Sequence, residues 1–162
     1  MLIEPLSQMD PELQKTVVTS MGKLGGAAAL AFAAIGSALG TGAAGSAAAG
    51  AMKKSYAQNK TPPFMVIAFV GFPLTQTIYG MIVQGMIVGA ATADAMFHNL
   101  FLGGLLAGIA MGMSAWMQGR AAAGACNALA ETGKGIANYV IVLGMIETVA
   151  LFVMAFAKNA IT

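Results

Sequence analysis

The sequence predicts an all-α membrane protein in which four transmembrane helices form two tandem hairpins. Of its 162 residues, 58% are hydrophobic and 9% are charged, and the mean hydropathy is +0.78. Soluble domains carry about 25% charged residues, so most of this chain is expected to lie in lipid. The few charged residues also leave long stretches of the sequence uncharged, and these stretches define the spans.

Three uncharged stretches are long enough to cross a membrane. They lie at positions 24–52, 61–93 and 95–119. A helix needs about 20 residues to cross a hydrocarbon core of about 30 Å. The fourth span, 135–157, contains a single charged residue, Glu147, with twelve uncharged residues before it and ten after it. The last predicted helix therefore has a carboxyl group near its middle.

The predicted organisation is an extramembrane tail and two hairpins, at residues 1–22, 23–92 and 93–162. The tail has acidic residues and prolines where a secretory signal would have a basic start and an apolar run. Asp10 before Pro11 is typical of an N-cap followed by proline at the first helical position. We therefore expect a short amphipathic helix from Pro11 to about Ser20.

Weak internal similarity relates the two hairpins. One alignment of the two halves pairs Ser37 with Ser114, and a slightly different register pairs Thr75 with Thr148. If the hairpins are copies of each other, both enter the membrane in the same direction.

Lys and Arg are unevenly distributed between the connecting segments. Lys53, Lys54 and Lys60 follow the first span, Lys134 precedes the fourth, and the connection between the second and third spans has no basic residue. Cytoplasmic loops carry an excess of Lys and Arg. Both termini are therefore expected on the non-cytoplasmic side.

Several classes of site are excluded by the sequence. The net charge of +2 is small and scattered, which argues against a nucleic-acid surface. The glycines of residues 40–45 match a dinucleotide-binding pattern, but they lie in the middle of a span with no acidic residue about 20 positions later. The two Gly-Lys pairs lack the upstream glycine of a phosphate-binding loop. We expect no nucleotide site in this chain.

The first span is composed almost entirely of small residues. From position 24 to 50, more than three quarters of the chain is Gly, Ala or Ser, and Ala38, Gly42, Ser46 and Gly50 recur at every fourth position. Small residues let helix backbones approach closely in a membrane. The ridge could pack against other helices of one monomer. A helix with small side chains on every face, however, favours a position with close neighbours on several sides, such as the inner wall of a ring of subunits.

Glu147 is the residue on which the chemical interpretation depends. A charged side chain at the centre of a membrane helix costs about 3 kcal/mol or more, so this carboxyl group must be protonated, paired or bound to a cation. One interpretation is structural, a protonated Glu147 hydrogen-bonded between helices. Other oxygen-bearing side chains at suitable positions favour a cation site.

These oxygen-bearing side chains lie on two other spans. Thr75, Gln76 and Tyr79 share one helical stripe with Phe72, and Gln118 is an amide in an otherwise small and apolar stretch. Pro73 removes a backbone hydrogen bond and can free carbonyl oxygens for a ligand. An all-oxygen set suits a hard cation, and a single carboxylate neutralises a monovalent one. Sodium therefore fits better than calcium.

Three segments of the chain resemble the 16-kDa proteolipid of V-type ATPases, subunit K of the sodium-translocating bacterial kind. The resemblance extends from about Gly25 to Ala157 and is strongest in Phe72–Gly80, Trp116–Gly124 and Met145–Ala150. That family forms a membrane rotor ring, which ATP hydrolysis in a separate soluble sector drives against a stator subunit. The resemblance implies a multi-pass subunit of a bacterial or archaeal cytoplasmic membrane.

The resemblance also implies a site. Side-chain oxygens of Thr75, Gln76, Gln118 and Glu147 and the backbone carbonyl of Phe72 would bind Na⁺. Tyr79 would donate a hydrogen bond to the carboxylate of Glu147 and lock it inward. The chain departs from sodium-type relatives at Leu74 and at Val149. Neither residue is an expected ligand, so no ligand is lost.

The expected function is therefore that of a non-catalytic subunit that carries Na⁺ during rotation. Its expected partners are further copies of itself in the ring, the stator subunit, central-stalk subunits and lipid. A proton-carrying ring of the same family is the first alternative. A small four-span proton-coupled transporter and a purely structural pore-former are the others.

Overall fold

The computed structural model describes residues 9–92 and 95–161, and these are almost entirely helical. The elements are α1 (Pro11–Ala57), α2 (Met65–Gly71), the 3₁₀ turn η2 (Phe72–Leu74), α3 (Thr75–Ala90), α4 (Phe97–Thr132) and α5 (Ile136–Ile161). In the described part of the chain, four helical segments are long and apolar enough to cross a membrane: α1, α2 to α3, α4 and α5. The predicted all-α membrane fold is confirmed.

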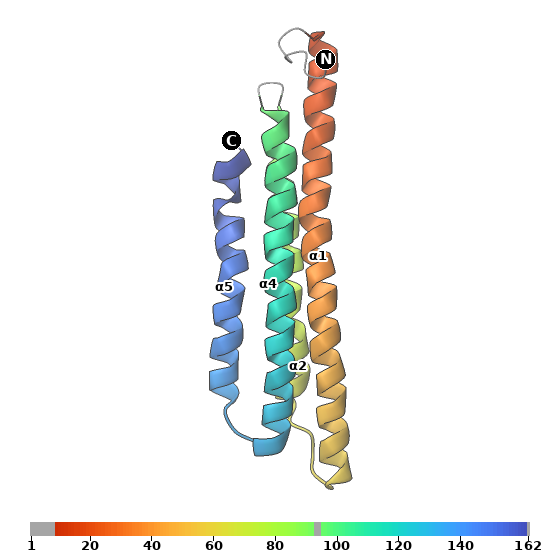
Figure 1. Cartoon of the computed structure of the whole chain (residues 1–162), viewed down its shortest axis with the longest axis vertical. Helices are drawn as coiled ribbons and strands as arrows, with labels where there is room; N and C mark the ends of the chain where they lie inside the picture. The colour runs from red at the N-terminus through yellow and green to blue at the C-terminus, as the bar shows by residue number, and fades with distance from the viewer. Residues whose placement is uncertain (1–8, 93–94, 162) are drawn as a thin grey trace.

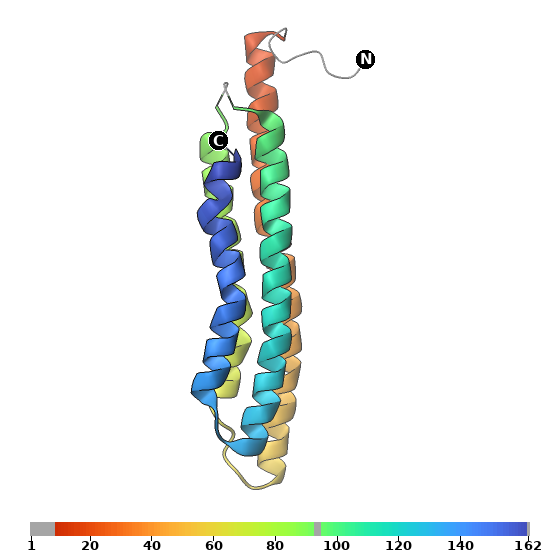
Figure 2. The same ribbon diagram turned by 60° about the vertical axis from the view of Figure 1, so that its left-hand side comes forward.

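The four segments form an elongated bundle of two hairpins (Figures 1 and 2). α1 and α4 lie side by side and run in the same direction, while α3 and α5 return beside them. The start of α1 and the end of α5 therefore lie at the same end of the bundle. Residues 1–8 of the predicted tail lie outside the described residues.

α1 begins where the sequence predicts but ends far later. The side chain of Asp10 accepts a hydrogen bond of 2.9 Å from the backbone N–H of Glu12, with Pro11 at the first helical position. The predicted end near Ser20 is wrong, because the helix is 47 residues long and ends at Ala57. Glycines weaken an isolated helix, but here Gly22 and several others are buried against neighbouring helices, and this tertiary packing sustains α1.

Glycines bring the backbones of α1 and α4 into direct contact. A Cβ atom on Gly36 would overlap the carbonyl oxygen of Gly112, and one on Gly104 would overlap that of Gly25. Farther along, a Cβ atom on Gly119 would overlap the backbone of Gly40. Only glycine permits so close an approach, so these residues fix the register of the two helices.

The small-residue ridge expected on α1 does not pack within the chain. Its members Ala38, Gly42, Ser46 and Gly50 are all exposed. The buried residues follow a parallel ridge, which consists of Gly36, Gly40, Ala44 and Ala48. Packing inside one monomer is therefore the wrong interpretation of the first ridge.

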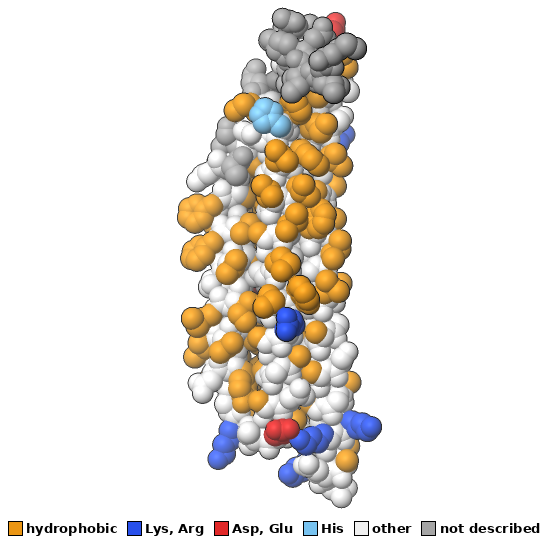
Figure 3. All heavy atoms as spheres, in the orientation of Figure 1, with side chains coloured by type: hydrophobic (Ala, Val, Ile, Leu, Met, Phe, Trp, Pro, Cys, Tyr) orange, Lys and Arg blue, Asp and Glu red, His pale blue; other side chains and the backbone are white. Residues whose placement is uncertain are grey.

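Charged side chains gather at the end of the bundle where each hairpin turns (Figure 3). Lys54 of α1 and Glu131 of α4 form an ion pair of 2.8 Å there, with both side chains largely exposed. An exposed pair contributes little stability. The predicted grouping of basic residues at one end of the molecule nevertheless agrees with the arrangement of the two turns.

The backbone contact between α1 and α4 yields a stability prediction. Gly36→Ala should lower the free energy of unfolding by about 1–3 kcal/mol, because its methyl group has no space beside Gly112. Denaturation of the purified protein in mixed detergent micelles, followed by circular dichroism, measures this. Gly85→Ala is the matched control, since no heavy atom lies within 4 Å of its Cβ position. Equal stability of the two variants would contradict the packing argument.

Candidate ion-binding site

Glu147 lies in α5, on the side of that helix that contacts α3 and α4. Its side chain is half-buried, whereas Thr148 and Val149 next to it are exposed. The hydroxyl of Thr148 bonds only to the carbonyl of Met145 in its own helix, at 2.6 Å. The carboxyl group is thus the polar group that α5 directs toward the rest of the bundle.

Both carboxylate oxygens of Glu147 accept a hydrogen bond from another helix. The hydroxyl of Tyr79 on α3 donates to Oε1 at 2.7 Å, and Nε2 of Gln118 on α4 donates to Oε2 at 3.2 Å. A carboxylate in a low-dielectric setting gains most from such donors. The three helices therefore meet at this group.

Gln118 is the centre of the hydrogen-bond network. It is fully buried, and its Nε2 also donates to the backbone carbonyl of Leu143 at 2.9 Å. Its Oε1 accepts from Nε2 of Gln76, a second fully buried amide, at 2.8 Å. Buried amides are costly unless they are satisfied, and here the bond between the two amides satisfies the oxygen of Gln118 and an N–H of Gln76.

The chain of hydrogen bonds continues to the 3₁₀ turn at Pro73. The hydroxyl of Thr75 lies 2.9 Å from the carbonyl oxygen of Phe72 and 3.2 Å from Oε1 of Gln76. The backbone N–H of Thr75 also donates to the carbonyl of Phe72. Three oxygen atoms are therefore close together, and a single hydroxyl proton is shared among them.

All six residues expected at the site belong to this one network. Phe72, Thr75, Gln76 and Tyr79 come from η2 and α3, Gln118 from α4 and Glu147 from α5. The two departures from sodium-type relatives, Leu74 and Val149, are 53% and 54% exposed and point away from it.

Sequence reasoning missed two contributions to the site. The hydroxyl of Ser114 donates to the carbonyl of Ile146 at 3.0 Å, which joins α4 to α5 beside Glu147. Ser114 lies one helical turn before Gln118, so both residues are on one face of α4. This spacing could have indicated Ser114 from the sequence. The other contribution, the carbonyl of Leu143, is a backbone group that no side-chain pattern indicates.

The network contains one acidic group and no basic one. Among the described residues there is no group of three or more His, Cys, Asp or Glu side chains that could hold a metal. Arg120 lies two residues from Gln118, about 200° away around the helix, and is exposed. A proton or one monovalent cation is sufficient to neutralise Glu147.

Comparisons with known proteins give two matches to this chain. Residues 101–157, which hold Gln118 and Glu147, match the family of the ATP synthase C subunit. Over 149 residues the chain is 31% identical to the A-type ATP synthase subunit K of Methanocaldococcus jannaschii; the alignment covers 86% of this chain and 65% of that relative. The chain thus spans less than two thirds of the relative's length. The chain is thus similar to membrane subunits of ATP synthases, and in its described part it has four helices apolar and long enough to span a membrane.

Proposed function

We propose that this chain is a subunit of the membrane rotor ring of a V/A-type ATPase, in which Glu147 carries Na⁺ across the membrane. The observation that carries the proposal is the carboxyl group midway along the last apolar helix, bonded by Tyr79 and Gln118 from two other helices. A carboxyl group is costly to place in lipid. Its presence in α5 is explained if the ion that neutralises it is also the ion that the protein transports.

Sodium as the cargo is supported by the oxygen atoms around the carboxyl group. The carbonyl oxygen of Phe72 and Oε1 of Gln76 already lie within 3.2 Å of the hydroxyl oxygen of Thr75. Rotation of the Gln118 amide about its last torsion would turn its oxygen toward Glu147 in place of its N–H, and it would break the bonds of this amide to Gln76 and to the carbonyl of Leu143. Five oxygens from three helices would then surround a cation of one charge, as hard cations prefer.

A proton is the second candidate, and one observation favours it. Gln118 contacts Glu147 through its N–H, so the network as it stands is a complete chain of hydrogen bonds that a neutral carboxyl group can join without any ion. Sodium remains our preference, because a proton requires none of the oxygens gathered at Thr75.

Assembly into a homo-oligomeric ring is supported by surfaces left free in the single chain. The small ridge of α1 defined by Ala38, Gly42, Ser46 and Gly50 is exposed and allows close approach of a neighbouring helix. On the opposite hairpin, α5 exposes large apolar side chains suited to lipid, among them Met145, Phe152 and Phe156. The first face would lie within the ring and the second at its outer surface.

In this ring, ion exchange is coupled to rotation. A Glu147 neutralised by Na⁺ passes the lipid at low electrostatic cost, and a basic group of the stator displaces the ion at its interface. Each charge moved against 100 mV requires about 2.3 kcal/mol, so ATP hydrolysis in a separate sector must drive the movement. The charged end of the bundle, with Lys53 and Lys54, would face the cytoplasm and the central stalk.

Labelling of Glu147 by dicyclohexylcarbodiimide at fixed pH tests the proposal. The reagent modifies protonated carboxyl groups, so bound Na⁺ should protect Glu147 and NaCl should slow labelling at least about tenfold, whereas KCl of equal ionic strength should not. Mass spectrometry of the labelled peptide measures the rate, and Glu147→Gln should abolish labelling and transport. Rapid labelling that NaCl does not slow would indicate the proton-carrying ring.

Loss of one ligand oxygen should weaken this protection while the ring still assembles. For Thr75→Ala and Gln118→Ala, the NaCl concentration that halves labelling should rise about tenfold, equivalent to about 1.4 kcal/mol, the scale of one hydrogen bond or ligand contact. Thr77→Ala is the matched control on α3. If Thr75→Ala and Gln118→Ala respond to NaCl as the wild type does, these residues do not bind the ion.

The hydroxyl of Tyr79 should limit access to the carboxyl group. Tyr79→Phe removes a hydrogen bond of 2.7 Å to Glu147, and we expect labelling without sodium to accelerate about three- to tenfold, the range for an intramembrane hydrogen bond. Tyr139→Phe, in the first turns of α5, should leave the rate unchanged. An unaltered rate in Tyr79→Phe would exclude a locking role.

A further inference from the structure

Ser37 is a buried residue of α1 whose hydroxyl group has no hydrogen-bond partner. The residue is 2% exposed, and among the described residues its hydroxyl oxygen is the buried side-chain polar atom left without a bond. Other hydroxyls of the same helix, those of Thr41, Ser46 and Ser55, lie 2.8–3.1 Å from a carbonyl oxygen one turn earlier. A buried hydroxyl without a bond is costly, so we expect Ser37 to have a partner in another state of the protein.

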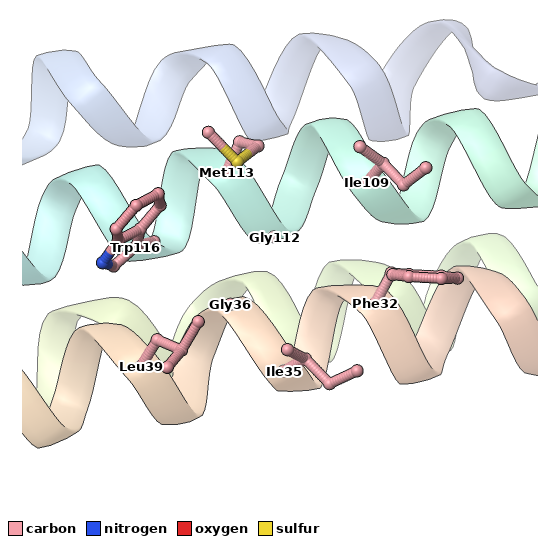
Figure 4. A pocket seen from close by; sticks show the side chains of 8 residues that line it. All are labelled: Phe32, Ile35, Gly36, Leu39, Ile109, Gly112, Met113 and Trp116. Atoms are coloured by element: carbon pink, nitrogen blue, oxygen red, sulfur yellow. The ribbon is translucent and has the colours of Figure 1, made fainter.

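Ser37 lies at the interface of α1 with α3. Gly36, the residue before it, meets Gly112 of α4, and Figure 4 shows these two glycines where the two helices approach each other. Ser37 is turned about 100° from Gly36 around the helix. It shares a face of α1 with Gly26, three turns earlier, where a Cβ atom would touch the side chain of Gln84 on α3.

Gln76 is the residue of α3 that lies opposite Ser37. Two contacts between small or compact residues fix the register of these antiparallel segments: Gly40 with Pro73, and Gly80 with Ala33. Ser37 lies between the two contact positions on α1, and Gln76 lies between them on the second segment, one turn from each. Both residues are buried. The hydroxyl of Ser37 is therefore at the level of the hydrogen-bond network, on the side of Gln76 that faces α1.

The amide of Gln76 also has an unsatisfied group. One N–H of its Nε2 donates to Oε1 of Gln118 at 2.8 Å, and its Oε1 lies 3.2 Å from the hydroxyl oxygen of Thr75. In the described part of the chain, the second N–H of this amide has no bond. A donor on α3 and an acceptor on α1, each without a partner, thus belong to one interface.

We propose that Ser37 accepts a hydrogen bond from Nε2 of Gln76 when Na⁺ is bound, an inference that rests on the function proposed above. If the oxygen of Gln118 turns to the ion, its bond to Gln76 breaks, and Nε2 of Gln76 loses its acceptor inside the protein. The hydroxyl oxygen of Ser37 replaces that acceptor after a small turn of the Gln76 amide toward α1.

This bond would orient the oxygen of Gln76 toward the ion. Oε1 and Nε2 lie on opposite sides of the amide carbon, so an Nε2 atom held by α1 directs Oε1 away from α1 and into the site. Ser37 is then a positioning residue, because it contacts a ligand of the ion and not the ion itself. It gives α1, which supplies none of the expected ligands, a polar role in binding.

Sodium protection of Glu147 against dicyclohexylcarbodiimide tests this role in the assembled ring. In Ser37→Ala, the NaCl concentration that halves labelling should rise about fivefold, the scale of one hydrogen bond. The labelling rate without sodium should stay that of the wild type. Alanine is smaller than serine, so the variant needs no new space between the helices. Ser46→Ala is the matched control, because its exposed hydroxyl bonds within its own helix, and it should respond to NaCl as the wild type does.

Thermal unfolding separates a positioning role from simple packing. Loss of an unsatisfied hydroxyl should leave the melting temperature of Ser37→Ala without sodium unchanged or higher, whereas the rise in melting temperature on adding NaCl should be smaller than in the wild type. A lower melting temperature without sodium, with faster labelling, would mean that Ser37 only packs.

The labelling experiment also distinguishes this inference from the proposed function. If NaCl protects the wild type and Ser37→Ala at the same concentration, the inference is wrong and the sodium site stands. If NaCl does not protect the wild type, the proposed sodium transport is wrong and the inference falls with it.

Discussion

The cost of a carboxylate in lipid is the constraint on which this structure depends. Glu147 can occupy the middle of α5 only if other groups satisfy its oxygens, and each of them accepts a hydrogen bond from a different helix. Gln118 can supply one of these bonds only because Gln76 and the carbonyl of Leu143 satisfy the rest of its amide. One acidic group thus determines the polar contacts of three helices.

Helix α1 contributes no side chain to this network but sets the distances within it. A Cβ atom on Gly40 would overlap the carbonyl of Ala115 on α4 and crowd the ring of Pro73 on the second segment. Because Gly40 has no side chain, both segments approach α1 at the level of the site. Gln76 and Gln118 can then reach each other with an ordinary hydrogen bond of 2.8 Å. A small residue outside the hydrogen-bond network therefore helps to set the distances within it.

The two charged groups in the apolar part of α4 and α5 are kept on separate sides. Gln118 faces Glu147, whereas Arg120 contacts the ring of Trp116, about 200° around the same helix. An arginine within the network would pair with the carboxylate in a low-dielectric setting and hold it permanently. The separation leaves Glu147 to be neutralised by an exchangeable ion.

The amino-acid sequence by itself determined the four spans and the N-cap at Asp10, because hydropathy, charge spacing and helical periodicity are local properties. It also indicated the six residues that the structure joins in one hydrogen-bond network, and their role in binding an ion stays a prediction. Tertiary structure alone decided that α1 continues past Ser20, since packing against other helices outweighs the weak propensity of its glycines. It also decided which of two equally small ridges on α1 is buried and which is exposed. The contact made by the carbonyl of Leu143 is likewise a consequence of how the helices pack. A backbone group has no sequence signature, and whether a small residue is buried depends on neighbours that are distant in the chain.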